Sequence, residues 1–173
     1  LSAVLSGYDG ARLDRHLTQG ATRVADSAGS SASVIGRGPG LFTLMGVPAA
    51  GQSVQALEHA LRAQVARVAQ EGVSEAELAR VKTPWMAAHI YERGSLMSQA
   101  QQLGSHWVQG LPLDADERLL QALETITPAQ VQAVAARYFG DDQLTVATLG
   151  PQPRAAGARP VPTAAAGTSA RMH

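Results

Sequence analysis

The chain of 173 residues has no cysteine, few aromatic residues and no net charge, since 14 Lys and Arg balance 14 Asp and Glu. The missing cysteine excludes disulfides and thiolate metal sites. A neutral balance with few rings that could stack on bases argues against nucleic-acid binding. No apolar run reaches the length of a membrane span, and no basic start followed by an apolar stretch marks a signal peptide.

The composition that remains is typical of one globular domain. Apolar residues make up 45% of the chain and charged residues 16%, and 173 residues can bury one sizeable core. We expect this domain to span residues 1–150. Residues 151–173 are rich in proline and alanine, which predicts a flexible tail. The start at Leu1 without methionine suggests a fragment of a longer protein.

The first third of the chain predicts a helical start followed by a hairpin. Residues 1–17 favour a helix, a break and a second short helix. Small, partly alternating residues over 22–35 predict a strand, and residues 41–47 predict another. The glycine-rich stretch 36–40 between them is typical of a hairpin turn. We therefore expect an antiparallel pair.

Beyond the hairpin the spacing of apolar residues becomes helical. One helix is predicted from residue 54 to a stop at Gly72. Ser74 and Glu77 form a capping pattern for a long helix that reaches Trp107. Pro84 is expected to kink or split this helix, because proline lacks a backbone donor.

The end of the domain predicts one more helix and a strand. Thr127, Pro128 and Gln130 are typical of a helix start, and Gln143 to Leu149 alternates like a closing strand. The expected fold class is therefore α+β, with an antiparallel sheet covered on one face by helices.

Three segments occur in an order and spacing that point to a known family. They are ARLDRHL at residues 11–17, VSEAELARVK at 73–82 and ITPAQVQAVAARYF at 126–139. Together with the elements between them, they resemble the carboxy-terminal domain of the pitrilysin/insulinase family of zinc metallopeptidases. Mitochondrial processing peptidases and bacterial periplasmic zinc proteases are similar, and the resemblance covers most of residues 1–151.

The resemblance implies a domain that works beside a catalytic partner. Family members are clamshells of two homologous halves, each with two similar α/β domains. One half carries His-x-x-Glu-His, which holds zinc and activates water. This chain is then a non-catalytic domain that lacks its first strand, with zinc only in a catalytic half elsewhere in the polypeptide or in a second subunit. Bacterial relatives favour the periplasm, while the residues themselves leave the compartment open.

One segment lies a single substitution away from the zinc motif. Gln55-Ala56-Leu57-Glu58-His59 has glutamine where the first histidine would stand, and glutamine is a poor zinc ligand. The segment also follows the second predicted strand, whereas the family motif lies on the first helix of its domain. The other histidines lie on separate segments without ligand spacing: His16, His89, His106 and His173. We predict no metal site in this chain.

The resemblance also places two substrate-holding groups near the first helix end. Active relatives have an arginine directly after the leucine that ends this helix, and a tyrosine seven positions later. Here the leucine is Leu17, so Thr18 and Ala25 occupy these positions. Neither supplies the missing donors, and we predict no catalytic residue. Arg23, with Thr18, is the candidate for substrate binding, and the alternative for Arg23 is a surface salt bridge.

Two functions follow from these observations. The first is an inactive domain of a zinc peptidase that closes the clamshell and presents strand edges to an extended peptide. The second is a structural or assembly module derived from a peptidase, with no role in proteolysis. An intact His-x-x-Glu-His in the parent or a neighbouring reading frame would favour the first function.

Overall fold

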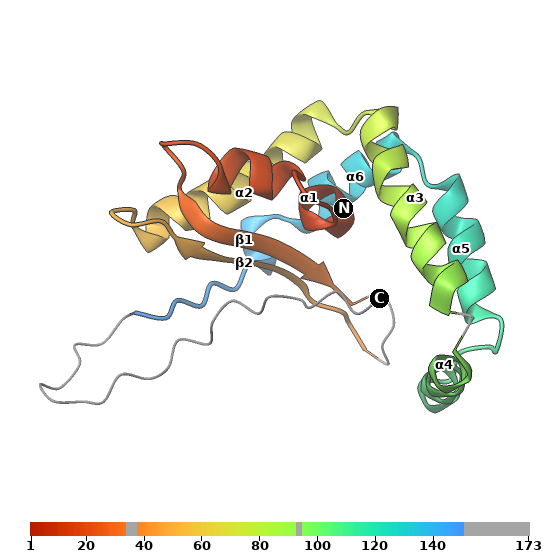
Figure 1. Cartoon of the computed structure of the whole chain (residues 1–173). Helices are drawn as coiled ribbons and strands as arrows, with labels where there is room; N and C mark the ends of the chain where they lie inside the picture. The colour runs from red at the N-terminus through yellow and green to blue at the C-terminus, as the bar shows by residue number, and fades with distance from the viewer. Residues whose placement is uncertain (34–37, 93–94, 151–173) are drawn as a thin grey trace, which may run out of the picture.

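The two strands and the helices of the chain form an α+β fold, which confirms the predicted class (Figure 1). The structure is a computed structural model that describes residues 1–33, 38–92 and 95–150. The predicted tail therefore lies outside the described residues. The elements are α1 (Ser2–Ser6), η1 (Asp14–Thr18), β1 (Ala25–Ala32), β2 (Phe42–Pro48), α2 (Val54–Glu71), α3 (Glu75–Glu92), α4 (Leu96–Gln109), α5 (Ala115–Thr125), α6 (Pro128–Tyr138) and η2 (Asp141–Gln143).

The strands β1 and β2 form the predicted antiparallel pair. Their register runs from Ala25 opposite Pro48 to Ala32 opposite Phe42, with an irregularity just after Ala25. The predicted turn at 36–40 falls partly outside the described residues. Small side chains dominate β1, so β1 adds little apolar volume to the core.

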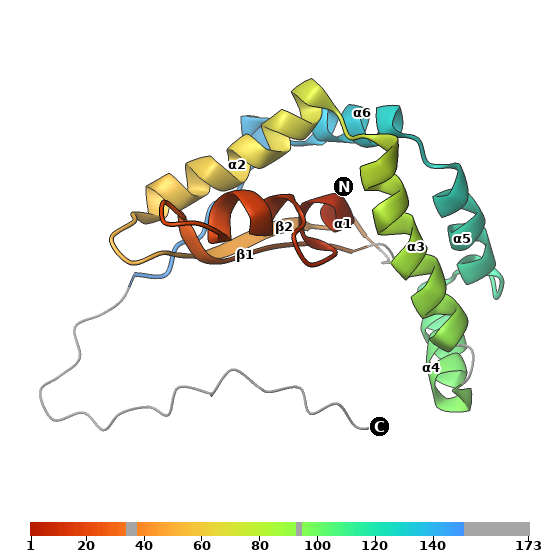
Figure 2. The same ribbon diagram turned by 45° about the horizontal axis from the view of Figure 1, so that its top comes forward.

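Helices cover one face of this sheet, as predicted (Figures 1 and 2). α2 packs on β2, while α1 and η1 pack on β1, and α6 lies along α2. Gly46 allows this close packing, because an added Cβ would come within 3.1 Å of Leu57. Side chains from both layers form the core cluster: Leu5, Leu13, Leu17, Ala25, Leu57, Leu61, Val65, Val68, Leu78, Val131 and Ala135.

α2 ends and α6 begins at the predicted signals. The side chain of Ser53 accepts a hydrogen bond from the backbone of Ala56 at the start of α2. α2 ends at Gly72, whose φ of 75° is a conformation that glycine adopts without strain. At α6, Thr127 and Gln130 form a complete capping box with proline in the first turn.

The predicted long helix is two helices, and the break is not at Pro84. α3 continues through Pro84 to Glu92, and α4 begins at Leu96. Ser74 accepts a hydrogen bond from the backbone of Glu77, as a capping residue should. Pro84 is exposed, so α3 has room to absorb the missing backbone donor. The sequence reading also missed α5.

The predicted closing strand from Gln143 to Leu149 is wrong. After η2, residues 144–150 are irregular and exposed. A strand needs a neighbouring backbone to bond with, and the described sheet contains only β1 and β2. The apolar alternation is present in this segment, but no described strand lies beside it. Of the described helices, none is both long and apolar enough to cross a membrane.

Candidate functional site

Thr18 holds the end of η1 through a local hydrogen bond. Its hydroxyl lies 2.9 Å from the carbonyl oxygen of Asp14 and 2.5 Å from Asp14 Oδ1. The backbone N–H of Gly10 and the amide of Gln19 both donate to Asp14 Oδ2 at 3.0 Å. These donors, Thr18 first, lower the pKa of Asp14 below its usual value. The hydroxyl of Thr18 is therefore engaged within η1.

Ala25 is fully buried at the start of β1. Its exposed fraction is 0%, and its methyl group belongs to the core cluster. The loop before it is closed by a 3.0 Å hydrogen bond from the backbone of Val24 to the carbonyl of Leu17. The position that the resemblance assigns to a substrate-holding tyrosine is thus a core position in this chain.

Arg23 forms an ion pair with Asp26, three positions later in the sequence. Arg23 Nη2 donates to Asp26 Oδ1 at 2.9 Å, and both side chains are about half exposed. Exposed pairs of this kind contribute little to stability. The structure thus gives each of the three predicted residues its own surroundings: Thr18 bonds Asp14, Arg23 pairs with Asp26, and Ala25 is buried.

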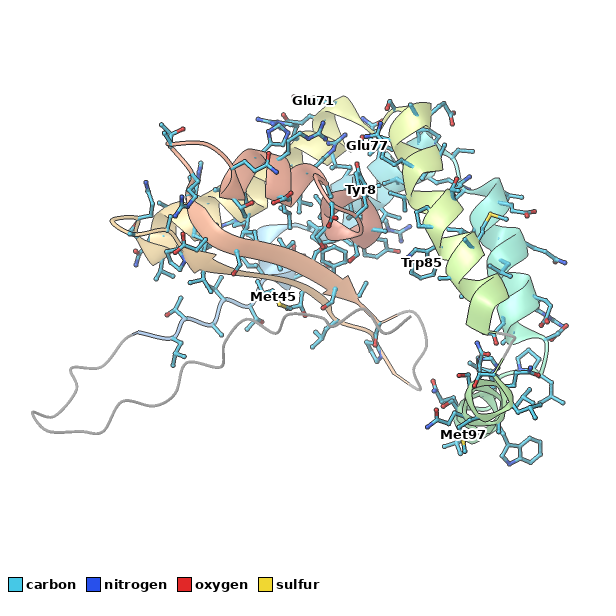
Figure 3. The ribbon with its side chains drawn as sticks, viewed as in Figure 1. Tyr8, Met45, Glu71, Glu77, Trp85 and Met97 are labelled. Atoms are coloured by element: carbon cyan, nitrogen blue, oxygen red, sulfur yellow. The ribbon has the colours of Figure 1, made fainter. Side chains whose placement is uncertain are left out.

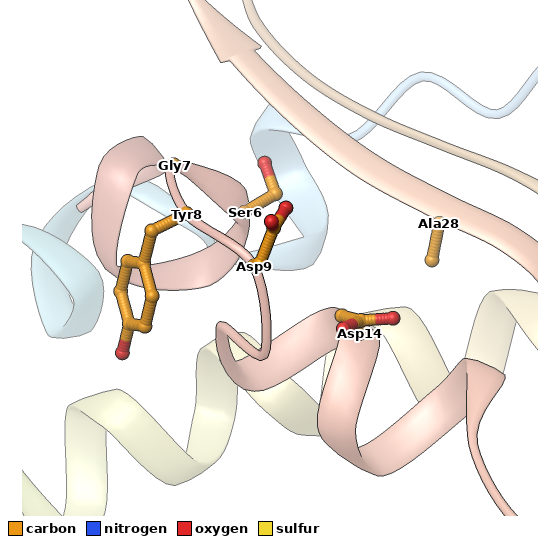
Figure 4. A pocket seen from close by; sticks show the side chains of 6 residues that line it. All are labelled: Ser6, Gly7, Tyr8, Asp9, Asp14 and Ala28. Carbon is orange, nitrogen blue, oxygen red and sulfur yellow. The ribbon is translucent and has the colours of Figure 1, made fainter. Parts of the chain in front are cut away.

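A shallow hollow of about 390 Å³ lies beside β1, where the chain turns between α1 and η1 (Figure 4). Figure 4 shows Asp9, Asp14 and Ala28 around it, while the ring of Tyr8 points away. The complete lining consists of Ser6, Gly7, Tyr8, Asp9, Asp14 and Ala28. The sequence reading did not single out this hollow, because its residues come from three separate elements.

Ser6 of α1 bonds the outer edge of β1 at one point. Its hydroxyl accepts from the backbone N–H of Ser30 at 2.9 Å and lies 3.2 Å from the carbonyl oxygen of Ser30. The backbone of Ser30 therefore faces away from β2. Alternate residues of an antiparallel strand direct their backbone groups to the same side, so Ala28 and Ala32 face this outer edge too. Ala28 thus combines an outward backbone with a place in the hollow.

A largely buried ion pair holds the segment with the hollow against the helices. Arg12 Nε and Nη2 each lie 2.7 Å from an oxygen of Glu77, and Nη2 also donates to the carbonyl of Gly72 at 2.9 Å. The hydrogen bond from Arg12 lowers the pKa of Glu77 and raises that of Arg12. Arg80 lies 5.8 Å from the ring centroid of Tyr8.

Both members of this pair lie in segments that carry the family resemblance, ARLDRHL and VSEAELARVK. The sequence reading did not identify them as partners. Each is a charged residue next to a leucine, and this pattern indicates a charged group close to the core. The pattern does not identify which carboxylate pairs with which guanidinium.

The donor set of the near-motif on α2 does not fit zinc. Gln55 and His59 are exposed on the helix surface, and Glu58 lies 3.7 Å from Arg62 in an ion pair. Within the described side chains, those of residues 1–33, 38–88 and 95–150, no three His, Cys, Asp or Glu come together to hold a metal ion. We therefore derive no zinc chemistry from this chain.

The fold defines the class of protein as an α+β domain, in which helices cover one face of the described antiparallel sheet. Residues 1–84 match the family model of the peptidase M16 inactive domain. This match covers 84 of the 173 residues and confirms the predicted resemblance to a domain of a zinc peptidase family. No curated protein matches the chain.

Solved bacterial structures share the fold. A protease from Helicobacter pylori has a TM-score of 0.73 and 21% identity over 82% of this chain. The inactive peptidase domain of a "Putative Zinc Protease" from Bordetella parapertussis has a TM-score of 0.71 and 18% identity over 88% of this chain. A "putative zinc protease" from Bordetella pertussis Tohama I has a TM-score of 0.70 and 17% identity over 82% of this chain.

The three structures differ in how much of their own length this fold accounts for. The chain spans 34% of the Helicobacter pylori protease, 77% of the Bordetella pertussis protein and 81% of the Bordetella parapertussis domain. In the first of these proteins the shared fold is thus about a third of a longer chain.

Proposed function

We propose that this chain is the non-catalytic partner of a zinc-carrying peptidase half, and that it holds an extended peptide along the outer edge of β1. The proposal rests on Ala28, whose backbone faces the outer edge of β1 beside the open hollow. An added peptide strand takes its affinity from main-chain hydrogen bonds, so it does not need the side-chain donors that Thr18 and Ala25 lack.

The arrangement of α1 supports a short contact rather than a long added strand. Ser6 already occupies both backbone groups of Ser30. A peptide can therefore pair with Ala28 but must leave the edge before it reaches Ser30. Asp9 and Asp14 give the adjoining hollow a negative lining. The zinc and the activated water belong to the partner half, either in the same polypeptide or in a second subunit.

The test combines this chain with a catalytic half that contains His-x-x-Glu-His and follows cleavage of an unstructured peptide. Ala28→Pro removes one outward N–H and leaves the bonds to β2 in place. Ala32→Pro is the matched control, because its N–H also faces outward but lies beyond Ser30. We expect a roughly tenfold loss of stimulated cleavage for Ala28→Pro only, as for a lost main-chain bond and its contacts. Equal activity of both variants and the parent would overturn the proposal.

The second candidate is an assembly module without a role in proteolysis. The engaged side chains favour it: Thr18 bonds Asp14, and Arg23 pairs with Asp26. This function predicts that a complex with a catalytic half forms but that peptide cleavage is the same with and without this chain.

A further inference from the structure

The helix α4 is amphipathic, but its apolar side faces solvent. Positions three and four apart place one set of residues on a single side of the helix. The large members are highly exposed: Leu96 84%, Met97 72%, Leu103 46% and Trp107 78%. Figure 3 shows Met97 on the side of α4 that points away from α3 and α5. Ala100 and Gly104 complete this apolar side, and we call these six residues the α4 face.

The opposite side of α4 is polar and contains the only buried residue of the helix. His106 is 2% exposed, and its Nε2 lies 3.3 Å from Asp116 of α5. Ser98, Gln102 and Gln109 share this side, and all three are partly covered. An ordinary surface helix buries its apolar side and exposes its polar side. α4 has the reverse pattern, since it exposes leucine, methionine and tryptophan. The α4 face therefore has the character of an interface.

Two features of α4 indicate close contact with another helix. No Asp, Glu, Lys or Arg occurs among its 14 residues, so neither side has the charges that usually solvate an exposed helix. Gly104 costs about 1 kcal/mol of helix stability relative to alanine. A Cβ at Gly104 would meet no atom of the described residues within 4 Å, so packing among these residues does not explain the glycine. A second backbone approaching at this point would explain it.

We propose that the α4 face is a self-association surface, on which α4 of a second copy of this chain packs antiparallel. We place the twofold axis at the level of residue 102 along the helix. Met97 then lies opposite Trp107 of the second copy, and Ala100 lies opposite its Gly104. The small residues then meet in the middle and the large ones at both ends, where a methionine sulfur contacts an indole ring. Because α4 has no charged residue, the twofold axis brings no like charges together.

The exposed area matches this occupant. Six neighbouring residues, of which four are large and half to four-fifths exposed, offer several hundred Å² of mostly apolar surface. This is close to the roughly 800 Å² per partner of a standard interface once the polar rim is added. The surface is also separate from the β1 edge, so the inference does not depend on the proposed function.

The first test is sedimentation of the 173-residue chain from about 1 μM to about 1 mM, a range that brackets weak and moderate dimers. We expect a concentration-dependent dimer. Trp107→Ser should weaken it at least about tenfold, since tryptophans that become buried at an interface carry much of the binding energy. Trp85→Ser is the matched control, because Trp85 is 43% exposed on α3 outside the α4 face, and it should leave the dimer unchanged.

The second test identifies both the occupant and the register. Ala100→Glu and Gly104→Lys should each abolish dimers, since each places an unpaired charge in the centre of the interface. Mixing the two variants should restore a dimer, because the new carboxylate then faces the new ammonium group across the axis. Gly104→Lys favours the helix, so its effect cannot come from lost folding. Circular dichroism checks the fold of every variant.

Three results overturn the proposal. The first is a parent chain that stays monomeric at about 1 mM. The second is an equal weakening of the dimer by Trp85→Ser and Trp107→Ser. The third is a mixture of Ala100→Glu and Gly104→Lys that fails to associate. Protection of Trp107 fluorescence from quencher only after a catalytic half is added would assign the α4 face to that half instead.

Discussion

The guanidinium of Arg12 donates two hydrogen bonds of 2.7 Å to the carboxylate of Glu77, which lies 65 positions later in the sequence. Their side chains are only 11% and 12% exposed. The third contact, from Arg12 to the carbonyl of Gly72, ties the same group to the end of α2. One arginine therefore fastens the amino-terminal segment to the junction of two helices and so fixes the position of the hollow.

Removing the carboxylate should destabilise the fold markedly. Glu77→Gln leaves the guanidinium of Arg12 largely buried without a charge partner, a change that costs about 3 kcal/mol. The measurement is urea unfolding followed by circular dichroism. Glu75→Gln is the matched control, because Glu75 lies exposed in the same first turn of α3 and should cost less than about 0.5 kcal/mol. Equal midpoints for both variants would show that the pair contributes nothing.

The same pair gives the stability a pH dependence with a defined sign. Arg12 lowers the pKa of Glu77 in the folded chain. The stabilisation is complete above the pKa of an unfolded glutamate, about 4.3, and is lost as the pH falls through the lower folded value. We expect the parent chain to lose stability more steeply than Glu77→Gln below about pH 4.5. Parallel acid-unfolding curves would contradict this assignment.

Thr18 should control the acidity of Asp14. The hydrogen bond from Thr18 is the largest cause of the lowered pKa of Asp14, so Thr18→Ala should move this pKa up toward its usual value. Thr18→Ser keeps the hydroxyl and should preserve the low pKa. Gln19→Ala should have a smaller effect than Thr18→Ala, because the bond from Gln19 is a minor cause. Carboxyl ¹³C chemical shifts, followed by NMR through an acid titration, report the three values directly.

Restoring the family's donors should damage this chain without making it an enzyme. Ala25 is fully buried, so Ala25→Tyr overpacks the core and should cost about 1–3 kcal/mol or more. Thr18→Arg combined with Ala25→Tyr should hydrolyse no unstructured peptide on its own, since neither change supplies an activated water. Thermal unfolding measures the first effect and peptide digestion the second. Hydrolysis by the tag-free double variant would be evidence against the inactive assignment.

Replacing the proline inside α3 should strengthen that helix. Pro84 lacks the N–H that would bond to the preceding turn, and its side chain is exposed. Pro84→Ala restores the donor and should raise the free energy of unfolding by about 1–3 kcal/mol. Thr83→Ala at the neighbouring exposed position should change it far less. A lower melting temperature for Pro84→Ala would mean that the ring makes packing contacts that outweigh the missing bond.

Sequence patterns predicted those elements whose signals are local. Gly72, Thr127 and Gln130 mark helix ends by their own backbone and side-chain chemistry, and all three act as predicted. The hairpin follows from alternation and the glycines between its strands. The order of the motifs also predicted an inactive peptidase domain, because a family resemblance depends on many positions at once.

Features that depend on distant partners escaped the sequence reading. Gln143 to Leu149 alternates like a strand, but a strand also needs a neighbour, which the described sheet does not offer. The ion pair between Arg12 and Glu77 depends on how the amino-terminal segment packs against α2 and α3. Trp107 fits a helical apolar pattern, and nothing in that pattern says whether the apolar side turns inward or outward.

The ion pair between Arg12 and Glu77 also has a consequence for the order of folding. Bringing together groups 65 residues apart costs about 4 kcal/mol of chain entropy before any contact forms. The hairpin and α2 need only short loops, so they can form earlier. We therefore expect the contact between Arg12 and Glu77 to form after these local elements, so that it locks the amino-terminal segment against the helices late in folding.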